Sequence, residues 1–139
     1  MKKTIAAFED VQLLVRSFYN KVLSDDILSH YFSYVFAHHW EKHLNVLDTF
    51  WSNILFYTGG YDGNPLQTHQ TLHHFKGLSS AAFDRWLQLF NQTVDELFEG
   101  EKAALAKQRA LSIATVMQLK ILPKQVDAVA PIDQEANKQ

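Results

Sequence analysis

The helical spacing of apolar residues is the feature that most limits what this chain can fold into. Apolar side chains recur every three or four residues in several long segments, and no segment shows the strict alternation of a half-buried strand. The first such set, which predicts a helix ending near Leu23 with Tyr19 on its flank, consists of Phe8, Val11, Val15, Phe18 and Val22. We therefore predict an all-α fold.

A second long helix is predicted from Trp40 to Tyr57. Its apolar face consists of His43, Leu47, Phe50, Trp51, Ile54 and Leu55. Gly59 and Gly60 follow as a C-terminal stop signal. Between the first two helices, Ser24-Asp25-Asp26 is a turn or helix-start signal, and a separate short helical turn is expected to carry Leu28, Tyr31 and Phe32.

Two more helices complete the predicted domain. The third begins after Ser79 or Ser80, stops at Gly100 and has an apolar face of Phe83, Trp86, Leu87, Phe90, Val94, Leu97 and Phe98. The fourth ends at Pro123 and has a face of small residues, namely Ala103, Ala106, Ala110, Ile113, Ala114 and Met117. We expect one domain of two helix pairs over residues 1–122 and a flexible tail over 123–139.

Composition excludes several classes of protein. The 139 residues carry a formal charge of −2 without a basic cluster, so we expect no nucleic-acid partner. Cysteine is absent, which rules out disulfides, thiolate ligands to iron and a cysteine nucleophile. Aromatic residues make up 13% of the chain, including ten Phe, and this share is high enough to suggest a wide apolar cavity or unusually bulky packing.

Neither a membrane span nor a signal peptide is expected. No stretch approaches the roughly 20 apolar residues that cross a bilayer. The start, Met1 to Phe8, imitates a signal peptide, but Glu9 and Asp10 interrupt the apolar run too early. We therefore expect a cytoplasmic protein.

Two histidines occupy unusual places in this pattern. His43 interrupts an apolar stripe, and His69 lies in a short polar segment before an aromatic-rich helix. An imidazole at each place, with Tyr19 and Trp86 as hydrogen-bond donors, suits the two faces of a flat iron cofactor, and haem binding is the leading hypothesis. The alternatives are a core histidine at 43, a solvated loop histidine at 69, and buried Tyr19 and Trp86 that bond only to backbone.

Two other metal assignments stay open on spacing alone. His73 or His74 can replace His69 as the iron ligand, because they lie in the same connecting segment. His39 and His43 are one helical turn apart and fit a zinc-binding helical module. In a zinc hydrolase helix, however, the glutamate directly follows the first histidine, whereas Glu41 points roughly to the opposite side.

Several separated motifs together resemble the group III truncated haemoglobins. They are Phe18–Val22, Phe32, Trp40–His43, Phe50-Trp51, Tyr61–His69 and Phe83–Phe90. The resemblance runs from about Phe8 to Met117 and keeps the motifs in order. It implies a two-on-two helical sandwich around haem b.

The same resemblance implies roles for individual residues. His69 is the proximal iron ligand, and Tyr19, His43 and Trp86 contact the small ligand on the other face of the haem. The residues implied to bind the cofactor are Phe32, Leu47, Phe50, Trp51, His73 and Trp86. His74 and Lys76 compete with His73 for the haem propionates.

The implied function is reversible binding of O₂ and other diatomic ligands such as NO and CO. Polar donors beside the ligand also suit peroxide chemistry or nitric oxide dioxygenation, so a haem enzyme is the alternative. Such an enzyme would need a separate reductase as electron donor.

Overall fold

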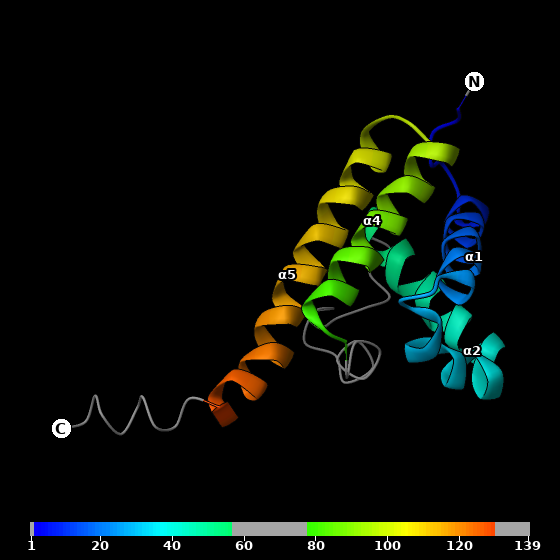
Figure 1. The fold of residues 1–139 in the computed structure, drawn as a ribbon. Coiled ribbons are helices and arrows are strands. Elements are labelled where there is room, and N and C mark those ends of the chain that lie inside the picture. Colours follow the sequence, from blue (N-terminus) through cyan, green and yellow to red (C-terminus); the bar gives the residue numbers. More distant parts are fainter. Residues whose placement is uncertain (1, 57–77, 130–139) are drawn as a thin grey trace.

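The computed structural model has four α-helices within the residues that it describes, 2–56 and 78–129, with the backbone alone described for 33–39 and 120–129. The helices are α1 (Phe8–Ser24), α2 (Ser29–Phe56), α4 (Ser80–Leu97) and α5 (Glu101–Val129). Helix α1 packs on α2 and on α4, and Figure 1 shows α4 and α5 side by side, running in opposite directions. The prediction of an all-α fold of two helix pairs is confirmed.

A carboxylate fixes the start of α1. Asp10, in the first turn, accepts hydrogen bonds from the backbone N–H groups of Ala6 (2.8 Å) and Ala7 (3.0 Å). Lys3 Nζ lies 2.7 Å from the same carboxylate. A negative charge here also interacts favourably with the helix dipole. The predicted apolar stripe is buried from Val11 to Val22, but Phe8 is 44% exposed because it lies at the very first position of the helix.

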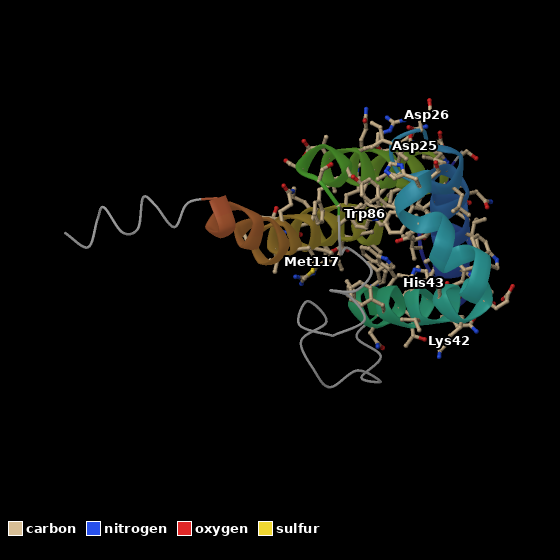
Figure 2. All side chains as sticks on the ribbon, turned by 60° about the horizontal axis from the view of Figure 1, so that its bottom comes forward. Asp25, Asp26, Lys42, His43, Trp86 and Met117 are labelled. Atoms are coloured by element: carbon tan, nitrogen blue, oxygen red, sulfur yellow. The ribbon has the colours of Figure 1, made fainter. Side chains whose placement is uncertain are left out.

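Helix α2 is longer than predicted. The expected short turn around Phe32 and the expected helix from Trp40 are one helix of 28 residues, which changes direction partway along (Figure 2). The prediction of two separate elements was wrong, because the intervening residues contain no Gly or Pro that would stop a helix and Phe36 links Phe32 to Trp40 at helical spacing.

Helix α4 begins as predicted, because Ser79 caps it by accepting a hydrogen bond from Ala82 N (3.1 Å).

The turn between α4 and α5 is tied to the N-terminal segment. Helix α4 ends at Leu97, before the predicted stop at Gly100, because buried Phe98 is extended and forms an isolated β-bridge with Lys3. Gly100 has φ +99°, a conformation that L side chains rarely adopt.

Helix α5 presents small residues to the core. Every residue of its predicted face is buried, namely Ala103, Ala106, Ala110, Ile113, Ala114 and Met117. The predicted end at Pro123 was wrong, because the helical backbone continues to Val129. Proline keeps a helical φ although it cannot donate a hydrogen bond, and the next proline is Pro131. The domain boundary at 122 stays a prediction, and residues 130–139 lie outside the described part.

Candidate functional site

Tyr19 is the centre of a buried aromatic cluster between α1 and α2. Its side chain is 1% exposed, because the helical spacing of α1 turns it toward the core beside Phe18. The Tyr19 ring centroid lies 4.6 Å from that of Phe18, 6.2 Å from that of Phe32 and 6.3 Å from that of His43, each with edge-to-face geometry. One hydroxyl therefore lies among aromatic rings, where a polar group needs a hydrogen-bond partner.

Trp86 on α4 lies next to this hydroxyl. The Trp86 ring is 5.5 Å from that of Phe18, which also contacts Tyr19, and the indole, whose only polar group is an N–H donor, lowers the pKa of the Tyr19 hydroxyl. Trp86 is 2% exposed and is held from the other side by Phe90, with which it stacks at 5.8 Å and 14°. The contact between Phe18 and Trp86 thus joins α1 to α4.

The environment of Tyr19 keeps its hydroxyl protonated. Burial raises the pKa of this hydroxyl well above the ordinary value of a phenol, and the neighbouring Trp86 indole offsets only part of that effect. A neutral phenol retains its O–H, so Tyr19 can act as a hydrogen-bond donor at neutral pH.

His43 completes the group from α2. Its imidazole is half-buried and meets the Tyr19 ring at 84°. Figure 2 shows His43 and Trp86 in the interior between the helices, whereas the neighbouring Lys42 is exposed. We name Tyr19, His43 and Trp86 the donor cluster, because three different helices bring these three polar aromatic side chains to one region.

The apolar residues predicted to line a cofactor surround this cluster. Phe32, Leu47 and Trp51 are buried, and Phe50 is partly buried against Trp51 at 5.7 Å. The Trp51 ring stacks on Phe90 at 4.8 Å and 19°, and Phe90 in turn stacks on Trp86. A continuous series of aromatic contacts therefore leads from Trp51 to the donor cluster.

The predicted iron ligand lies outside the described residues. Residues 57–77 contain His69, its alternatives His73 and His74, and Lys76, which was considered for the haem propionates. Their roles stay predictions. The last turn of α2, which precedes that segment, is held by Lys102 of α5, whose Nζ donates to the Leu55 carbonyl at 3.0 Å.

Sequence reasoning missed a buried ion pair between α1 and α2. The carboxylate of Asp48 is fully buried and accepts from Arg16 Nη1 at 3.0 Å on both oxygens. Burial raises the pKa of Asp48, and the hydrogen bond and charge of Arg16 only partly counter it. The sequence contained one signal for this ion pair, because Asp48 places a carboxylate between the apolar residues Leu47 and Phe50.

A second missed ion pair joins α4 to the residues between α1 and α2. Arg85 donates from Nε to Asp25 Oδ1 at 2.7 Å, and its Nη2 lies 2.7 Å from the same oxygen. The other oxygen of Asp25 accepts from Ile27 N and Leu28 N, both at 3.1 Å. The sequence marked Asp25 as a turn residue, but nothing local to it indicated a partner 60 residues away.

Zinc binding and membrane insertion gain no support. Within the described residues, no three His, Cys, Asp or Glu side chains lie together as a metal site would require. The side chain of His39, the proposed partner of His43, is not among them. None of the helices in this part of the chain combines the length and apolar character needed to cross a membrane.

Comparison with known proteins identifies the family. No family model matches the chain. A relative from Campylobacter jejuni, the group 3 truncated hemoglobin ctb, is 30% identical, and the match covers 79% of this chain and 87% of the relative. The chain is a group III truncated haemoglobin. As a member of this family it is a haem-binding globin.

The structure of a truncated haemoglobin supports the same assignment. The crystal structure of a group III truncated hemoglobin from C. jejuni matches with a TM-score of 0.72 at 28% identity. The match covers 87% of this globin and 95% of that chain. The predicted family and its truncated-globin fold are thereby confirmed.

Proposed function

We propose that this globin holds haem b through His69 and binds O₂, NO and CO reversibly beside the donor cluster. The observation that carries the proposal is the meeting of Tyr19, His43 and Trp86 from three helices, since Tyr19 contacts His43 and both Tyr19 and Trp86 pack on Phe18. A buried group of polar side chains that face one another is costly in a core that serves packing alone. The same group suits a small polar ligand.

The described residues fit a haem in their chemistry. Phe32, Leu47, Phe50 and Trp51 are apolar side chains of the same core as the donor cluster, as a haem with its large apolar faces requires. Haem b would supply an iron able to bind both the His69 imidazole and a small diatomic ligand. His73 is proposed to contact a propionate.

Tyr19 and Trp86 are proposed to stabilise the ligand as a coupled pair. A ligand with partial negative charge is held by the Tyr19 O–H, which the neighbouring Trp86 indole polarises. Such hydrogen bonds are strengthened in surroundings of low dielectric constant, which the neighbouring aromatic rings provide. Slow release of O₂ is the expected consequence.

Oxygen dissociation rates test this role. Tyr19→Phe and Trp86→Phe should each speed O₂ release about tenfold, because one net hydrogen bond is worth about 1.4 kcal/mol. The double mutant should release O₂ more slowly than the product of the two single effects predicts, because the two side chains are proposed to act as a coupled pair. Unchanged dissociation in all three variants would show that neither side chain acts on the ligand.

Enzymatic turnover is the second candidate function. A protonated Tyr19 donor can assist cleavage of a peroxide O–O bond as well as retain O₂, and nitric oxide dioxygenation uses the same kind of site. Either reaction would need a separate reductase or another electron donor. Steady-state consumption of hydrogen peroxide or NO, compared between wild type and Tyr19→Phe, distinguishes turnover from simple binding.

A further inference from the structure

We propose that Asp25 and Arg85 are positioning residues that hold Trp86 against Tyr19 and thereby set how tightly the donor cluster retains its ligand. The inference rests on the proposed function. It concerns two side chains that lie outside the donor cluster and that no contact places on the ligand itself.

The ion pair joins the same two parts of the chain that meet where Tyr19 and Trp86 pack on the Phe18 ring. Asp25 directly follows α1, which carries Tyr19, and its backbone N–H donates to Val22 O at 3.2 Å. Arg85 directly precedes Trp86 in α4. Figure 2 shows Asp25 on the same side of the molecule as α4. A shift of α4 relative to the end of α1 would therefore disturb both contacts.

The geometry of the ion pair is restrictive. Two nitrogens of one guanidinium, Nε and Nη2, both lie 2.7 Å from Asp25 Oδ1, so the approach of Arg85 is fixed in direction as well as distance. Oδ2 is held by Ile27 N and Leu28 N, and Leu28 is completely buried. The side chain of Asp25 is only 7% exposed, so water competes poorly for these bonds.

The chain contains a matched control for this ion pair. Lys21 Nζ lies 2.8 Å from Glu96 Oε1 and also joins α1 to α4. The Glu96 side chain is 49% exposed, however, and lies ten residues beyond Trp86 in the sequence. Exposed ion pairs of this kind contribute little to stability or to geometry. Removing the charge of Glu96 should therefore leave Trp86 undisturbed.

The experiment compares Arg85→Gln, Arg85→Lys, Asp25→Asn and Glu96→Gln in the haem-loaded, CO-bound protein. Two readouts are independent of ligand release, namely hydrogen exchange of the Trp86 indole N–H by NMR and the C–O stretching frequency in the infrared. The third readout is the O₂ dissociation rate. Denaturant unfolding of each variant identifies any that fail to fold. If Arg85→Gln fails to fold, Arg85→Lys, which keeps the positive charge, takes its place in the comparison.

We expect Arg85→Gln and Asp25→Asn to speed indole exchange, to shift or split the C–O band, and to speed O₂ release about threefold or more. The three readouts of Arg85→Lys should lie between those of these two variants and those of wild type, because the lysine ammonium is a single point charge in place of two guanidinium donors. Arg85→Gln combined with Trp86→Phe should release O₂ no faster than Trp86→Phe alone. Glu96→Gln should match wild type in all three readouts.

Three outcomes would overturn the inference alone. They are unchanged indole exchange and O₂ release in both Arg85→Gln and Asp25→Asn, additive effects of Arg85→Gln and Trp86→Phe, or an equal effect of Glu96→Gln. If Trp86→Phe itself leaves O₂ release and the C–O band unchanged, the proposed role of the donor cluster fails and the inference fails with it. The two failures are therefore distinguishable.

Discussion

Among single residues, the role proposed for Tyr19 is the most demanding, since its hydroxyl would donate a hydrogen bond to the ligand while remaining buried. Burial raises the pKa of this hydroxyl, and the neighbouring Trp86 indole counters only part of the effect. Helical periodicity predicted that Tyr19 and Trp86 lie near apolar faces. It could not predict their contact, because 67 positions separate them and only the crossing of α1 and α4 brings them together.

His43 is predicted to act as a gate. Its imidazole is only half-buried beside Tyr19, so it can turn outward toward water once it is protonated. Ligand entry should therefore become faster as the pH falls through the usual range of histidine, and His43→Leu should lose this dependence. Flash photolysis of the CO complex measures the rate. A low-spin ferrous spectrum that disappears only in His43→Leu would instead make His43 an iron ligand.

His69 is predicted to supply the protein's bond to iron. His69→Ala should abolish stable haem incorporation or make it depend on added imidazole, because the variant lacks the imidazole proposed to bind the iron. Haem titration followed by absorbance measures the affinity, with His73→Ala and His74→Ala as matched controls. Wild-type affinity in His69→Ala together with its loss in either control would transfer the role to that histidine.

At the level of helices, the spacing of residues within one segment predicted which face of a helix is buried, but it did not predict contacts between segments. The buried faces of α1, α4 and α5 follow the spacing of apolar residues closely, and Ser79 caps α4 as its type suggests. The continuity of α2 was missed because the apolar spacing was followed only from Trp40, although Phe36 links Phe32 to Trp40 at helical spacing. The ion pairs of Asp25 and Asp48 were missed because both partners must be known before either is informative.

The two kinds of buried aspartate should have opposite effects on acid stability. The hydrogen bond from Lys3 and the N–H groups of Ala6 and Ala7 lower the pKa of Asp10, so its contribution to stability is present above the unfolded pKa and is lost as pH falls through the folded pKa. Burial raises the pKa of Asp48, so proton uptake by Asp48 favours the folded state as pH falls.

Urea unfolding between about pH 2 and pH 6 tests this contrast. The free energy of unfolding of Asp10→Asn should fall less steeply with acid than that of wild type, and that of Asp48→Asn should fall more steeply. Parallel curves for all three proteins would show that neither carboxylate has the shifted pKa described.

For the molecule as a whole, the ion pairs and the donor cluster share the same interfaces. Arg16–Asp48 lies between α1 and α2, as does the contact of Tyr19 with His43. Asp25–Arg85 joins α4 to the end of α1, and the packing of Trp86 on Phe18 joins the same two helices. The packing of three helices therefore determines the geometry of the donor cluster, and the family resemblance supplied what local patterns could not.

Haem binding and access for a diatomic ligand are the two properties on which the proposed function depends. Absorption spectra of the purified protein in its ferric, ferrous and oxygenated forms measure both. We expect a Soret band that shifts on reduction and shifts again when O₂ or CO is added. A protein that shows no Soret band after reconstitution with haem, or a band unmoved by either gas, would contradict the proposed function.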